Sequence, residues 1–84
     1  MLYETVSGWA KRANISASTL EKYYLLIEKV TTYRFHRNEK GNVIFSEEDA
    51  ILIRDIMKAR QEEGITLEDA CKLVVAQKVL RSLL

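Results

Sequence analysis

The stretch YRFHRNEKGNVIFS, residues 33–46, decides the fold of this 84-residue chain. It holds two β-prone runs, Tyr33–Phe35 and Val43–Phe45, and the charged segment between them contains Gly41, which favours a turn. Two such runs around a turn predict a β-hairpin. Because an isolated hairpin is only marginally stable in water, we expect its apolar side chains to pack on a helical layer. The side chains expected to make this contact are those of Tyr33, Phe35, Ile44 and Phe45.

Two short helices are predicted before the hairpin. The first begins after the N-cap residue Thr5 and ends near Asn14, which tolerates a left-handed conformation. Its apolar residues recur with helical spacing at Val6, Trp9, Ala10 and Ala13. The second begins at Ser16 or at Ser18, which also fits a capping box with Glu21. Its expected buried face consists of Ile15, Leu20, Tyr24 and Ile27. Two short helices separated by about three residues are typical of a helix-turn-helix.

Two further helices are predicted after the hairpin. The segments Ser46-Glu47-Glu48-Asp49 and Thr66-Leu67-Glu68-Asp69 each combine a hydroxyl N-cap with acidic residues in the first turn. Gly64 ends the helix that begins at Ser46. That helix is expected to face the core through Leu52, Ile53, Ile56 and Met57. The last helix is expected to do so through Leu67, Ala70, Cys71 and Val74.

These elements predict a mainly α fold with a small β-hairpin, namely a winged helix-turn-helix in the order α-α-β-β-α-α. We expect this domain to cover residues 1–72, followed by a C-terminal helix extension over residues 73–84. The extension carries a heptad a/d seam formed by Leu73, Ala76, Leu80 and Leu83. This seam either packs back on the domain or begins a coiled coil that joins two copies into a homodimer.

Composition is typical of a soluble globular protein. Hydrophobic residues make up 48% of the chain and charged residues 30%, and no apolar run is long enough to span a bilayer. The single cysteine, Cys71, excludes an internal disulfide and suits a reducing compartment, so we expect a cytoplasmic protein. In residues 1–45, seven Lys and Arg against four Glu give a net charge of +3, whereas six against eight acidic residues give −2 in residues 46–84.

The basic half carries a candidate surface for nucleic acid. On the second helix, small and polar residues lie opposite the buried face and allow close approach to base edges and phosphates. The candidate contacts there are Ser16, Ala17, Ser18, Thr19, Lys22 and Tyr23. On the hairpin, Arg37 and Lys40 are expected at the tip, where a wing can reach phosphates. The alternative is a solvated helix face and a hairpin charged only for solubility, and Glu21 counts against close approach to DNA.

The chain from Tyr3 to Leu73 resembles the MerR-like winged helix-turn-helix domain. The resemblance rests on Val6, Ala10, Ile15-Ser16-x-x-Thr19-Leu20, Tyr23, Gly41, Phe45-Ser46-Glu47-Glu48-Asp49, Leu52, Ile56, Gly64, Leu67 and Ala70. The chain departs from the family at Glu21, where MerR regulators usually carry a DNA-contacting arginine, and at Gly41-Asn42-Val43, where their wing commonly reads Gly-aromatic-Arg. Around the wing the chain is similar to bacterial chromosome-anchoring and plasmid-partition proteins.

The resemblance implies sequence-specific binding to double-stranded DNA, with the centromere-binding domain of a partition protein as the closest role. A MerR-like transcriptional regulator is the alternative within DNA binding. From another class of function, the same fold can serve as a protein-interaction module that presents Tyr23, Tyr33 and Phe35. The resemblance also adds Arg34 to the DNA-contacting residues already named on the helix and the wing.

Catalytic chemistry is not expected. His36 is the only histidine and is predicted to be exposed on the wing, and Cys71 and Trp9 are predicted to be core residues. The acidic residues lie at helix starts, where capping explains them. We therefore expect no enzyme activity, no metal site, no cofactor, no small-molecule ligand and no membrane partner.

Overall fold

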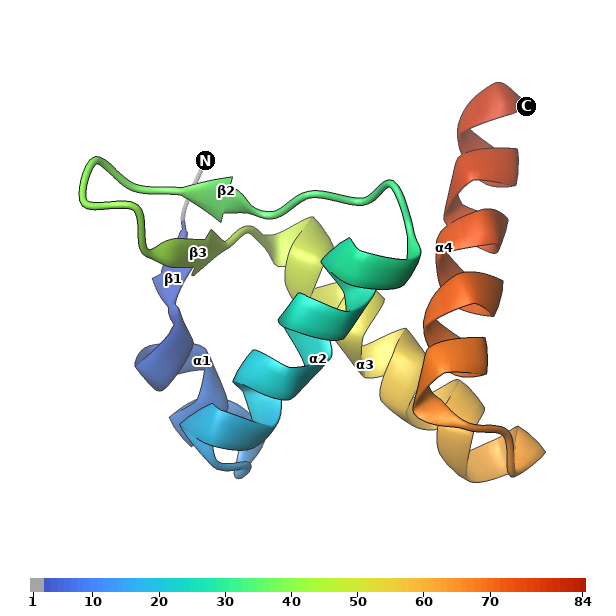
Figure 1. Ribbon diagram of the computed structural model, residues 1–84, viewed down its shortest axis with the longest axis horizontal. Helices are drawn as coiled ribbons and strands as arrows, with labels where there is room; N and C mark the ends of the chain where they lie inside the picture. The colour runs from blue at the N-terminus through green and yellow to red at the C-terminus, as the bar shows by residue number, and fades with distance from the viewer. Residues whose placement is uncertain (1–2) are drawn as a thin grey trace.

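The computed structural model describes residues 3–84, which form four helices and three short strands (Figure 1). In chain order they are β1 (Glu4–Thr5), α1 (Val6–Ala13), α2 (Ala17–Val30), β2 (His36–Arg37), β3 (Val43–Phe45), α3 (Glu47–Glu63) and α4 (Leu67–Leu83). The predicted class, mainly α with a small β component, is confirmed. Among these residues no helix has the combined length and apolarity that a bilayer crossing requires.

The sheet differs from the prediction in two respects. It is antiparallel with the order β1-β3-β2, so an N-terminal strand that the sequence did not indicate joins the hairpin (Figure 1). The first hairpin strand is His36–Arg37 rather than Tyr33–Phe35. The reason is that the Phe35 N–H donates to Glu28 Oε2 at 2.9 Å instead of to a neighbouring strand. Residues 33–35 therefore connect α2 to the sheet.

Local capping fixes the helix boundaries largely as predicted. Thr5 caps α1 by accepting from the Gly8 N–H, and Asn14 ends that helix in the left-handed conformation, with φ 59°. Ser16, and not Ser18, caps α2 by accepting from the Thr19 N–H at 3.1 Å. The later helices have the expected Ser46–Asp49 capping box, the Gly64 end and the Thr66 cap.

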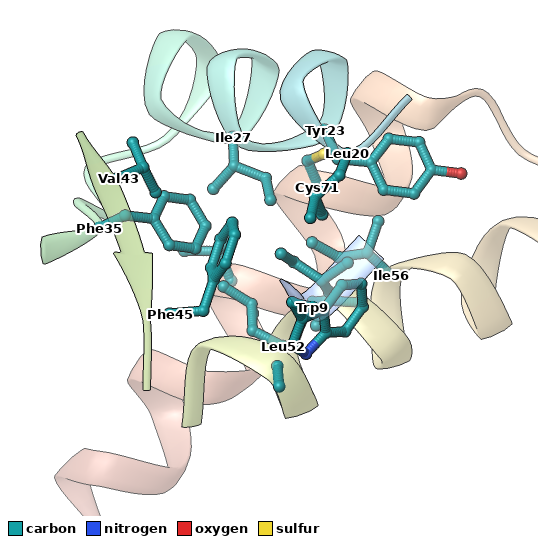
Figure 2. Close-up of a cluster of buried hydrophobic side chains, with 14 of the residues drawn as sticks. Trp9, Leu20, Tyr23, Ile27, Phe35, Val43, Phe45, Leu52, Ile56 and Cys71 are labelled. Atoms are coloured by element: carbon teal, nitrogen blue, oxygen red, sulfur yellow. The ribbon is translucent and has the colours of Figure 1, made fainter. Parts of the chain in front are cut away.

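The core lies between the four helices and the inner face of the sheet (Figure 2). Its central side chains are Trp9, Leu20, Ile27, Phe35, Phe45, Leu52, Ile53, Ile56 and Cys71. Trp9 and Cys71 are thus core residues as predicted, and burial raises the pKa of the Cys71 thiol to about 11. The buried tyrosine of α2 is Tyr23, whereas the predicted Tyr24 is only half-buried.

The C-terminal helix belongs to the domain for its first half. It packs against α3 and α2, and the core continues through Val74 and Val75, which lie within the predicted extension of residues 73–84. Beyond Val75, Leu80 is 61% exposed and Leu83 is 78% exposed. These two seam residues do not pack back on the domain, and Figure 1 shows the last turns of α4 extending past its neighbours.

Candidate nucleic-acid interface

The exposed face of α2 and the hairpin line one groove of about 610 Å³. From α2 the groove receives Ala17, Glu21, Tyr24 and Leu25. From the hairpin it receives Arg37, Asn38, Gly41, Asn42, Val43 and Ile44. The start of α1 completes it with Thr5, Val6 and Ser7. The recognition-helix candidate and the wing candidate therefore border the same hollow.

The start of α2 presents a cluster of three hydroxyl groups. Ser16 Oγ lies 2.7 Å from Thr19 Oγ1 and 3.2 Å from Ser18 Oγ, while it also accepts from the Thr19 N–H. Ala17, Ser18 and Lys22 are exposed beside this cluster, and Thr19 is half-buried. The structure thus brings five of the six predicted α2 residues together at one end of the helix.

The sixth predicted residue, Tyr23, lies elsewhere. Its side chain is 9% exposed and packs in the core, because the helical register turns it inward together with Leu20 and Ile27 (Figure 2). Tyr23 therefore offers little surface to DNA, and its role as a contact stays a prediction. Tyr23 and Phe35 are both buried, so neither presents much surface to a protein partner.

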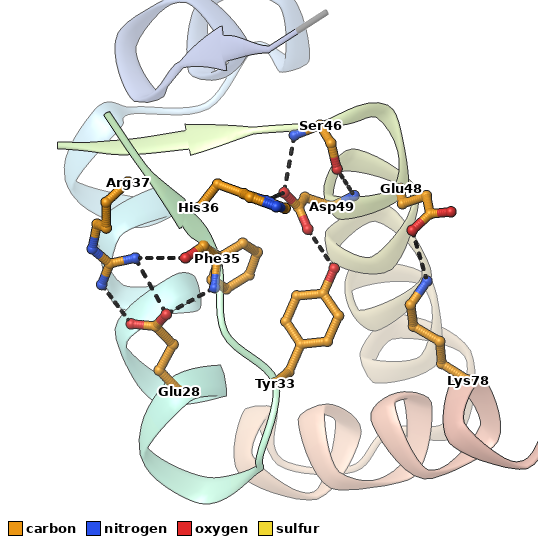
Figure 3. Close-up of polar contacts among 9 residues, drawn as sticks. All are labelled: Glu28, Tyr33, Phe35, His36, Arg37, Ser46, Glu48, Asp49 and Lys78. Atoms are coloured by element: carbon orange, nitrogen blue, oxygen red, sulfur yellow. Dashed lines mark hydrogen bonds and ion pairs between the residues drawn. The ribbon is translucent and has the colours of Figure 1, made fainter. Parts of the chain in front are cut away.

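Arg37 is the last residue of β2, directly before the turn, and its side chain is held against α2. Its guanidinium contacts Glu28 of α2, with Nη2 2.7 Å from Oε1 and Nη1 3.3 Å from Oε2 (Figure 3). Burial alone acts to raise the pKa of Glu28, but the hydrogen bonds from Arg37 and from the Phe35 N–H outweigh it and hold that pKa below its usual value. The ion pair joins the hairpin to α2.

Arg34 also makes contacts within the protein. Its Nη1 lies 2.9 Å from the Glu28 carbonyl oxygen, 3.1 Å from that of Thr31 and 2.8 Å from that of Tyr33. Carbonyls at a helix C-terminus lack intrahelical partners, and a guanidinium can satisfy them. In this structure, Arg34 therefore closes the end of α2.

The hairpin tip is built around Asn38. Its side-chain oxygen accepts from the Lys40 N–H at 2.9 Å and from the Asn42 N–H at 3.0 Å, and Gly41 adopts a φ of 83°. This turn leaves Lys40 exposed as the cation of the tip. Asn38 and Asn42 were missed as groove residues, although their amides could have been suggested by their turn positions.

Asp49 anchors the segment that leads into the hairpin. It is 2% exposed, and it accepts from the Ser46 N–H at 2.9 Å and from the Tyr33 hydroxyl (Figure 3). His36 is exposed as predicted, with Nδ1 3.9 Å from Asp49 Oδ2. The capping motif indicated the Ser46 contact, but nothing local indicated the contact with Tyr33, which lies sixteen positions earlier.

No cluster of three or more His, Cys, Asp or Glu side chains suited to a metal ion occurs in the described part of the chain, residues 3–84. Comparison of the sequence and structure with known protein families, with curated proteins and with solved structures gives no match.

Proposed function

We propose that this chain binds double-stranded DNA as a MerR-like winged helix-turn-helix domain, with α2 in the major groove and the hairpin along the adjacent backbone. The observation that supports the proposal is the groove that α2 and the hairpin share. Base edges are read from a helix in the major groove, while a neighbouring loop positions the protein through phosphates. The hydroxyl cluster at Ser16 and the start of α2 supply polar donors of the kind that contact phosphates.

Few cations are free for phosphate contacts at this surface. Lys22 and Lys40 are exposed, whereas Arg34 and Arg37 are engaged by α2. Since affinity for DNA depends steeply on the number of phosphates neutralised, one copy of the domain binds weakly under this proposal. Two copies joined through α4, or several copies on clustered sites, restore affinity through effective concentration.

Clustered sites suit a centromere-like element, so we propose partition of plasmid or chromosomal DNA as the biological role. Transcriptional regulation by the same domain is the competing role. The arrangement of the bound DNA separates them, because an array of repeats indicates partition and a single inverted repeat between promoter elements indicates regulation.

Fluorescence anisotropy with a labelled random-sequence duplex at two salt concentrations tests the proposal. Lys40→Ala should weaken binding and lower the slope of log affinity against log salt by about 1, as expected for one lost phosphate contact. Lys72→Ala is the matched control, because Lys72 lies on α4 and pairs with Glu68 there. Absence of binding below about 100 μM at low salt would refute the proposal.

A protein-binding function is the second candidate, and the exposed end of α4 favours it. Val79, Leu80 and Leu83 place apolar surface where the domain does not cover it. Exposed apolar patches of this kind mark interfaces between proteins. Failure to bind DNA together with self-association through α4 would favour this candidate.

A further inference from the structure

Three groove residues of α2 lie on one stripe of the helix. Ala17, Glu21 and Leu25 are spaced at i, i+4 and i+8, so they follow one another along the same side, and all three line the groove. Leu25 is 51% exposed, so its side chain is open to a ligand in the groove. Along this stripe, beside Tyr24, α2 presents to the groove a carboxylate with an apolar residue on each side.

Glu21 is available to a ligand in this groove. Within residues 3–84 its carboxylate accepts no hydrogen bond and has no cation within 4.0 Å, whereas Glu28, on the same helix, is paired with Arg37. The hydroxyl of Tyr24 feels the charges of both Glu21 and Arg37. Burial first and the negative charge of Glu21 second raise the pKa of Tyr24, while Arg37 acts to lower it. The carboxylate of Glu21 thus lines the groove, and no described residue there pairs with it.

A free carboxylate at a DNA interface is repelled by phosphates and by most base edges. In the major groove guanine presents two acceptors, thymine presents an acceptor and a methyl group, and adenine presents an acceptor beside its amine. Cytosine presents only its N4 amine, a donor, and a carboxylate accepts from it. Among the four bases, cytosine is the one whose major-groove edge complements Glu21.

We infer that Glu21 is a specificity-determining residue that selects cytosine in the bound duplex, flanked by thymines whose methyl groups contact Ala17 and Leu25. This inference rests on the proposed function. Four residues of the α-helix advance about 6 Å along its axis, a length close to that of two base-pair steps. Each thymine therefore lies about two base pairs from the cytosine. The ligand is a pyrimidine-rich strand read through its major-groove edge.

Selection of bound duplexes from a randomised library tests the inference. The 84-residue chain, Glu21→Gln and the control Glu62→Gln are each put through the selection; Glu62 is an exposed acid near the end of α3 and does not line the groove. The unsubstituted protein should enrich cytosine at one position, and Glu21→Gln should change that position to adenine, which glutamine reads through N6 and N7. On the cytosine site, Glu21→Gln should lose about 10-fold in affinity, as expected for the loss of one good base contact, while Glu62→Gln should keep both the motif and the affinity.

The outcomes separate the inference from the function beneath it. Failure of the unsubstituted protein to retain any duplex overturns the proposed function. A selected motif that Glu21→Gln leaves unchanged overturns the cytosine assignment and leaves DNA binding intact. The cytosine assignment also fails if Glu21→Gln tightens binding to all duplexes equally, because Glu21 then acts only by repelling phosphates.

Discussion

Glu28 and Arg37 join α2 to the hairpin through a two-point contact between carboxylate and guanidinium, with a closest distance of 2.7 Å. The same carboxylate accepts from the Phe35 N–H. One side chain of α2 therefore holds both the strand β2 and the segment that enters it. This contact ties the hairpin to α2, the two elements that the proposed interface uses together.

Glu28→Gln should lower the free energy of unfolding by about 1 kcal/mol. The amide keeps an acceptor for the Phe35 N–H but loses the ionic contact with Arg37, and a charge-assisted hydrogen bond between partly exposed groups contributes about that amount. Urea denaturation followed by circular dichroism at neutral pH measures the change. Glu39→Gln is the control and should cost nothing measurable; equal stabilities for both variants would contradict the role given to Glu28.

The contribution of Glu28 should depend on pH. Its pKa is lower in the folded protein than in the unfolded chain, so the unfolded state takes up the proton first as the pH falls. The stabilisation is complete above the unfolded value of 4.5 and is lost below it, as the pH falls through the lower folded value. The difference in unfolding free energy between the unsubstituted protein and Glu28→Gln should shrink across this range. A difference that stays constant from pH 7 to pH 3 would rule out this linkage.

Asp49→Ala should be more destabilising than Tyr33→Phe. Alanine leaves the buried Ser46 N–H and the Tyr33 hydroxyl without their acceptor, which costs about 2–4 kcal/mol, whereas phenylalanine removes only one donor to a carboxylate that keeps the Ser46 N–H. Thermal and urea unfolding of both variants and of the double variant give the coupling between the two side chains. Additive effects, with no coupling, would mean that the tyrosine hydroxyl contributes nothing through Asp49.

Leu80→Glu should abolish self-association while leaving the fold intact. Leu80 is exposed in the described structure, so a charge there costs the single chain little, but it would be buried in a pair of α4 helices. Light scattering across a concentration series measures the mass. Ser82→Glu adds the same charge at an exposed position off the seam and should leave association unchanged. If the unsubstituted protein is a monomer at every concentration, the homodimer prediction is wrong.

The helix boundaries could be predicted because their causes are local. A cap such as Ser46 needs only the backbone and side chain three residues on, and Gly64 needs only its own left-handed conformation. The identity of the buried tyrosine could not be decided in this way. Tyr23 and Tyr24 lie about 100° apart on a helix whose apolar face is broad, so the pattern accommodates either residue.

The sheet and the arginine roles depend on residues far apart in the chain. β1 has only two residues and forms because β3 offers it an unpaired edge, a condition absent from its own sequence. Arg37 was expected as a phosphate contact at the hairpin tip and Arg34 as a DNA contact from the resemblance, but α2 supplies the Glu28 carboxylate and the carbonyls at its C-terminus as partners. These contacts arise only once the helix and the hairpin lie side by side.

Thr5 has two roles, because it caps α1 and lies opposite Ile44 in the sheet. Any displacement of the hairpin is therefore transmitted to the first turn of the leading helix, and the reverse holds as well. The hairpin and the start of α1, which both line the groove, are mechanically coupled at that threonine. A duplex that displaced one of them would therefore strain the other.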